Sequence, residues 1–80
     1  MHTKFTFNLY TTSHCHLCEL AHELTLRHIN HDLINLVEIA DSHTLLTLYG
    51  MRIPVLQRTD TLAELSWPFS ETDLQQFITT

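Results

Sequence analysis

The pattern of hydrophobic and polar positions divides the first half of the chain into a strand, a helix and a second strand. Apolar residues alternate with polar ones over residues 5–10, as in a half-buried strand. Over residues 15–29 apolar positions recur at i, i+3, i+4 and i+7, which predicts a helix with one apolar stripe. The stripe consists of Leu17, Leu20, Ala21 and Leu24. A run of branched apolar residues at 33–39 predicts a second, largely buried strand.

A short helix is expected after the second strand. Asp41 or Ser42 can cap it, because their side-chain oxygens accept hydrogen bonds from the free N–H groups of a first helical turn. The helix then runs to Tyr49. Gly50, the only glycine of the chain, follows it at a position where a left-handed residue commonly ends a helix. We therefore expect a left-handed Gly50.

The last third of the chain predicts a hairpin and a final helix. Residues 51–57 and 62–66 are typical of two strands joined by a polar turn at 58–61, and Pro54 is placed at the beginning of the third strand. Residues 70–73 resemble a capping box with Asp in place of Glu, which marks a helix start. The inward positions of that helix are Leu74, Phe77 and Ile78.

The predicted order of elements is β-α-β-α-β-β-α, which defines an α/β fold. A strand-helix-strand unit of this length is a right-handed parallel crossover, and the last two strands form an antiparallel hairpin. The result is a four-stranded mixed sheet flanked by helices. With 80 residues and no linker or internal repeat, the chain is expected to form one domain over residues 1–80.

Cys15 and Cys18, the only cysteines, stand where the first helix begins. Residues i and i+3 of a helix are neighbours, so these thiols can form and open a short disulfide. The free N–H groups and the positive dipole end of a first helical turn stabilise a thiolate, which is the species that attacks a disulfide. Cys15 lies at the helix entrance and Cys18 one turn inward, beside the apolar stripe. We therefore predict that Cys15 is the nucleophile and Cys18 the resolving thiol.

Composition and charge exclude several classes of function. Four basic residues against nine acidic ones give a formal charge of −5, which argues against a nucleic-acid partner. No apolar run approaches the roughly 20 residues that a membrane helix needs. The first residues lack the features of a signal peptide, so we expect a cytoplasmic protein. A permanent structural disulfide is unusual in that compartment, which favours redox chemistry, sensing or metal binding.

Two alternatives to redox catalysis remain open. The first is a redox- or zinc-responsive binding module, because Cys15, Cys18 and His22 lie on one side of the predicted helix and His14 or His16 is close in sequence. One helix end rarely completes a zinc site, which would more often be shared between two chains. The other alternative is an interaction domain whose cysteines are idle.

Residues 10–18, which end in Cys15-His16-Leu17-Cys18, and residues 49–56 and 65–69 resemble the glutaredoxin-like branch of the thioredoxin superfamily. The match is to short bacterial-type members of undetermined function, and it spans essentially the whole chain. It implies a thioredoxin-like fold. It also implies that Pro54 is the cis-proline that faces the redox pair and that Ile53 presents its backbone to a bound thiol partner.

The chain departs from glutaredoxins in two places. His16-Leu17 stands where they usually carry Pro-Tyr, and the Gly-Gly-x-Asp segment that binds the glutathione carboxylate is absent. We therefore expect weak or no classical glutathione-dependent activity. Two positions could still receive an anion, namely Arg52 beside the substrate loop and the helix start at Ser70.

The predicted function is that of a monomeric, cytoplasmic thiol-disulfide oxidoreductase without a cofactor or a bound metal. Its redox pair is Cys15 and Cys18, and its substrate-binding residues are Ile53 and Pro54. Its partners are protein or small-molecule thiols and disulfides.

Overall fold

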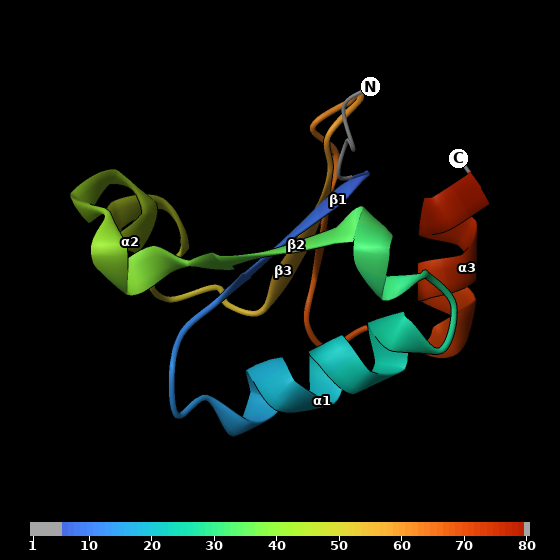
Figure 1. Ribbon diagram of the computed structural model, residues 1–80, viewed down its shortest axis with the longest axis horizontal. Coiled ribbons are helices and arrows are strands. Elements are labelled where there is room, and N and C mark those ends of the chain that lie inside the picture. The colour runs from blue at the N-terminus through green and yellow to red at the C-terminus, as the bar shows by residue number, and fades with distance from the viewer. Residues whose placement is uncertain (1–5, 80) are drawn as a thin grey trace.

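The computed structural model describes residues 6–79, in which four strands form one sheet of order β2-β1-β3-β4 (Figure 1). The strands are β1 (Phe7–Thr11), β2 (Ile34–Glu38), β3 (Val55–Arg58) and β4 (Glu64–Ser66). β1 is parallel to β2 and antiparallel to β3, and β3 forms an antiparallel hairpin with β4. The predicted mixed sheet and its order of elements are therefore confirmed. Phe5, the first residue of the predicted first strand, lies outside the described residues.

Helices cover both faces of this sheet. They are α1 (His16–Leu26), α2 (His43–Tyr49) and α3 (Glu71–Thr79), with short 3-10 turns at η1 (His31–Leu33) and η2 (Ile39–Asp41). In Figure 1, α1 runs along the lower side of the sheet, while α2 and α3 lie at opposite ends of the view. None of the helices within residues 6–79 is long and apolar enough to cross a membrane.

The alternation along β1 distributes its side chains between two cores. Phe7 and Leu9 point to the face covered by α1 and α3, where they join Ala21, Leu56 and Leu74 in the larger buried cluster. A smaller cluster on the opposite face packs α2 against the sheet. Its buried members are Tyr10, Ile39, Tyr49 and Val55. The period-2 pattern of a half-buried strand thus serves both layers.

The inward face of α1 differs from the predicted stripe. Its buried residues are Cys18, Ala21 and Thr25, whereas Leu17 and Leu20 are exposed. Small side chains on the inward face let the helix approach the sheet closely. The Thr25 hydroxyl donates to the Ala21 carbonyl oxygen at 2.7 Å, so its burial leaves no unpaired polar group.

One expected boundary and one expected burial were wrong. α1 ends at Leu26, not at residue 29, because the next two N–H groups bond to carbonyls three residues back, as in a tightened last turn. β2 is an edge strand and not largely buried, so Leu36 is 51% exposed. A run of branched apolar residues cannot distinguish an edge strand from a central one when the strand order is unknown.

Gly50 is right-handed, with φ −52° and ψ −34°, so the prediction of a left-handed glycine was wrong. Glycine fits here for a steric reason, because a Cβ atom would lie 2.5 Å from the carbonyl oxygen of Leu46. The prediction that Asp41 or Ser42 caps α2 is confirmed for Ser42, whose hydroxyl accepts from the Leu45 N–H at 3.2 Å.

The third strand is shorter than predicted, because it begins at Val55, directly after Pro54. The capping box before α3 is confirmed. The Ser70 N–H donates to Asp73 Oδ2 at 3.0 Å, and the Asp73 N–H donates to Ser70 Oγ at 3.1 Å. Leu74 is fully buried, and the other two predicted inward residues pack partly against the larger core.

Candidate redox site

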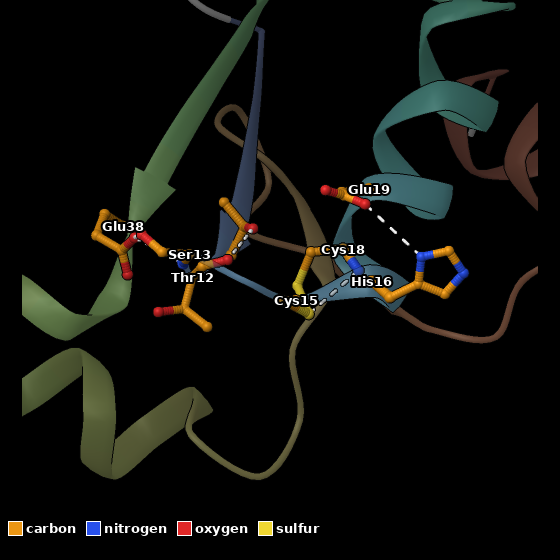
Figure 2. The surroundings of a disulfide bond; sticks show 8 residues. Thr12, Ser13, Cys15, His16, Cys18, Glu19 and Glu38 are labelled. Atoms are coloured by element: carbon orange, nitrogen blue, oxygen red, sulfur yellow. Dashed lines mark hydrogen bonds and ion pairs between the residues drawn. A yellow bond between two sulfur atoms is a disulfide. The ribbon is translucent and has the colours of Figure 1, made fainter.

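The two cysteines form a disulfide where β1 passes into α1 (Figure 2). Cys15 is the N-cap of α1 and Cys18 lies in its first turn, with their Cα atoms 5.2 Å apart. Cys15 is half-buried, whereas Cys18 is only 3% exposed. The predicted difference in access between the two sulfurs is therefore present.

The sulfur of Cys15 occupies the position of a helix-capping acceptor. The backbone of Cys15 is extended, with φ −106° and ψ 102°, and its Sγ accepts a hydrogen bond from the Cys18 N–H at 3.2 Å. A capping oxygen normally takes this role. When the disulfide opens, the same N–H group and the positive end of the α1 dipole are placed to stabilise negative charge on this sulfur.

The turn before Cys15 is fixed by Glu38 at the end of β2. Glu38 Oε1 accepts from the N–H and the hydroxyl of Ser13, at 3.1 and 3.2 Å (Figure 2). Its Oε2 accepts from the Ala40 N–H at 3.0 Å. Hydrogen bonding by the Thr12 side chain, followed by that of the Ala40 backbone, lowers the pKa of the Glu38 carboxyl. Glu38 therefore stays ionised at neutral pH while it holds the turn.

An open hollow of about 200 Å³ lies beside the disulfide. Its lining residues are Thr11, Thr12, Ser13, His14, Cys15, Cys18, Glu19, His22 and Leu36. Sequence reasoning missed Leu36 and the bracing carboxylate of Glu38, since both come from β2 and reach the site only through the parallel pairing of β1 with β2. The carboxyl ends of adjacent parallel strands lie at the same edge of a sheet, so the end of the second predicted strand could have been expected beside the cysteines.

The histidines near the cysteines do not assemble into a metal site. His16 Nδ1 lies 3.6 Å from Glu19 Oε2 in an exposed pair of the kind that contributes little stability. His14 and His22 both line the hollow, and His14 is exposed in the turn. Within residues 6–79 no group of three or more His, Cys, Asp or Glu side chains is arranged to hold a metal ion. The zinc alternative thus gains no support from the structure.

The peptide bond between Ile53 and Pro54 is cis, as the resemblance implied. A second cis bond, at Trp67–Pro68, was not predicted. Pro54 is buried, and its carbonyl oxygen accepts from the Trp67 N–H at 3.2 Å. Ile53 packs against the smaller core. Neither Ile53 nor Pro54 is among the residues that line the hollow.

The two positions considered for anion binding already have acidic partners. Arg52 Nη2 lies 2.6 Å from Glu64 Oε1, and the guanidinium stands 5.3 Å from the centre of the Tyr49 ring. At the start of α3, the N–H of Ser70 is bonded to Asp73. Both observations count against a glutathione carboxylate at these places.

The fold and the site together define a thioredoxin-like α/β protein with a C-x-x-C pair at a helix start. The family model described as "Glutaredoxin-like domain (DUF836)" matches residues 6–79. This chain therefore belongs to the glutaredoxin-like domain family.

Two solved structures carry the same fold. Both are of Northeast Structural Genomics target protein XcR50 from X. campestris. The X-ray structure is 33% identical and covers 91% of this chain and 95% of its own, with a TM-score of 0.78. The solution structure is 32% identical and covers 94% of each chain, with a TM-score of 0.79. No curated protein matches the chain.

Proposed function

We propose that this protein is a thiol-disulfide oxidoreductase in which Cys15 is the nucleophile and Cys18 the resolving thiol. The observation that carries the proposal is the hydrogen bond from the Cys18 N–H to Cys15 Sγ at the start of α1. It gives the more accessible sulfur a donor that favours the thiolate, while the resolving sulfur is buried one turn away.

The reaction consists of two exchanges. In the reduced protein, the Cys15 thiolate attacks one sulfur of a substrate disulfide, the substrate S–S bond breaks, and one half leaves as a thiolate. The Cys18 thiol then loses its proton and attacks Cys15 Sγ, which closes the Cys15–Cys18 bond and releases the second half. Two electrons pass from the protein to the substrate, and an external thiol reductant restores the dithiol.

The remaining parts of the proposal concern the surroundings of the pair. Ile53 and Pro54 are proposed to contact a bound thiol partner, by analogy with the family. We further propose that residues 1–80 act as one monomeric module in the cytoplasm, and that protein or small-molecule thiols and disulfides are its partners. No cofactor is required, because both electrons come from the dithiol.

The test is catalysis of the reduction of an uncharged disulfide, hydroxyethyl disulfide, by dithiothreitol. The wild-type protein should accelerate this reaction about tenfold or more over the double variant Cys15→Ser, Cys18→Ser. Circular dichroism of the variant checks that it is folded. Equal rates with the wild type and a folded double variant would show that the cysteines are idle.

A further inference from the structure

The charge around the dithiol hollow is negative. Glu19, which lies beside His16, is the only carboxylate among its lining residues; no lysine or arginine lines it, and its other ionisable side chains besides the cysteines are His14 and His22. The three arginines lie beside carboxylates elsewhere, and Lys4 is outside the described residues. These pairs are Arg27 with Glu71, Arg52 with Glu64, and Arg58 with Asp60.

A second carboxylate, that of Glu38, holds the turn before Cys15. In the view of Figure 2, Glu38 at the end of β2 is drawn to the left of the disulfide, and Glu19 on α1 is drawn above it. Glu38 is bonded to Ser13, which lines the hollow, and the hydrogen bonds that it accepts lower its pKa, so it is charged at neutral pH. Glu38 therefore adds a second negative charge next to the turn that leads into Cys15.

Two helix starts in the described part of the chain that could receive a substrate carboxylate already carry other groups. The first-turn N–H of α1 at Cys18 is taken by Cys15 Sγ. The start of α3 carries its own acids, Glu71 and Asp73. The net formal charge of −5 acts in the same direction at longer range.

We propose that this site selects disulfides that carry positive charge beside the reacting sulfur and discriminates against anionic ones, glutathione disulfide included. This inference rests on the proposed function. Like charges across a contact raise the free energy of approach, and opposite charges lower it and speed encounter. The effect is largest at low ionic strength, because at about 0.1 M salt charges more than roughly 10 Å apart are screened.

Three small disulfides of similar size and different charge provide the test. They are cystamine, which is cationic, hydroxyethyl disulfide, which is neutral, and dithiodiglycolate, which is anionic. The rate at which the fully reduced protein reacts with each is divided by the rate of 2-mercaptoethanol with the same disulfide, which removes differences in intrinsic reactivity. All rates are measured at pH 8, where an unperturbed histidine is uncharged.

We expect the normalised rate for cystamine to exceed that for dithiodiglycolate about tenfold at low salt, and the ratio to shrink severalfold in about 0.5 M salt. Glu19→Gln should lower the ratio about twofold to threefold. Glu23→Gln is the matched control, because Glu23 is exposed on the same helix and does not line the hollow. It should leave the ratio near that of the wild type.

The outcomes separate the two proposals. Reaction with all three disulfides at equal normalised rates, or faster reaction with the anion, overturns the selectivity and leaves the oxidoreductase function standing. If Glu19→Gln and Glu23→Gln lowered the ratio of the cystamine rate to the dithiodiglycolate rate equally, the preference would come from net charge. The role of the charge in the hollow would then be overturned. No reaction with any of the three would overturn the function itself, and the selectivity with it.

Discussion

At the scale of single residues, a network of polar contacts links the end of α2 to the sheet. The Tyr10 hydroxyl donates to Gln57 Oε1 at 2.7 Å, and the Tyr49 hydroxyl donates to Glu64 Oε2 at 2.6 Å. The two tyrosine rings stack with centroids 4.1 Å apart. Arg52 completes the group through its ion pair with Glu64. These contacts fix the connection that leads from α2 into Ile53 and the third strand.

The protonation states of this group follow from the same contacts. Burial, followed by the hydrogen bond to Glu64, raises the pKa of Tyr49, so its hydroxyl remains a donor. The Tyr49 hydrogen bond and the Arg52 pair lower the pKa of Glu64, and burial opposes them in part. The carboxylate is therefore favoured in the folded protein relative to the unfolded chain.

Glu64→Gln tests this account through the pH dependence of stability. Because the folded-state pKa of Glu64 is depressed, its contribution is full above the ordinary value of 4.5 and is lost as the pH falls below it. Between about pH 7 and about pH 3.5, the free energy of unfolding should drop by about 1 kcal/mol less in the variant than in the wild type, after allowance for solvent screening. Urea unfolding at the two pH values measures this difference. Glu23→Gln should retain the full drop, and an equal drop in Glu64→Gln would refute the assignment.

At the scale of elements, the position of α1 sets the geometry of the redox site. The helix packs on the sheet through Cys18, Ala21 and Thr25, so the resolving cysteine belongs to its buried face. Leu17, at the neighbouring helical position, is 49% exposed. In this orientation of α1, Cys18 belongs to the face that packs on the sheet, and Cys15 stays at the more accessible end of the helix.

Ala21→Leu and Leu17→Ala distinguish the observed face of α1 from the stripe expected from the sequence. Ala21 is fully buried, so a larger side chain must displace its neighbours and should destabilise the protein by about 1 to 3 kcal/mol. Leu17→Ala should change stability by less than about 0.5 kcal/mol, because Leu17 is half exposed and belongs to neither buried cluster. Denaturant unfolding of both proteins in the same redox state provides the comparison. A larger loss in Leu17→Ala than in Ala21→Leu would contradict the packing described.

Local patterns predicted the kinds of elements but not how they are oriented. The alternation in β1 and the capping residues Ser42 and Ser70 act over a few positions, so the sequence indicates them directly. Which side of α1 turns inward depends on the shape of the sheet below it, and the edge position of β2 depends on strand order. Neither is encoded in a local period.

The candidate site was predictable to the same extent. The cysteine pair and the cis bond at Pro54 could be inferred from spacing and resemblance. The hollow could not, because Leu36, which lines it, and Glu38, which holds the turn beside it, come from a strand about twenty residues away in sequence, through tertiary pairing. The sequence also suggested Arg52 as an anion contact, and only the folded chain shows that Glu64 pairs with it.

At the scale of the whole molecule, the fold brings two unlike sulfurs to one edge of an acidic protein. β1 and the turn held by Glu38 place Cys15 at the start of α1, and packing of α1 on the sheet buries Cys18. The function proposed for the protein depends on this division of roles between the two cysteines. An unequal pair can capture a substrate with one sulfur and release it with the other.

The most direct measurement is therefore the location of the mixed disulfide formed by each single-cysteine variant. Cys18→Ser and Cys15→Ser are reacted with hydroxyethyl disulfide for the same short time, and the adducts are located by mass spectrometry after proteolysis. The account predicts rapid accumulation of an adduct on Cys15 in the first variant and little adduct on Cys18 in the second. Equal trapping on both cysteines, or preferential trapping on Cys18, would contradict it.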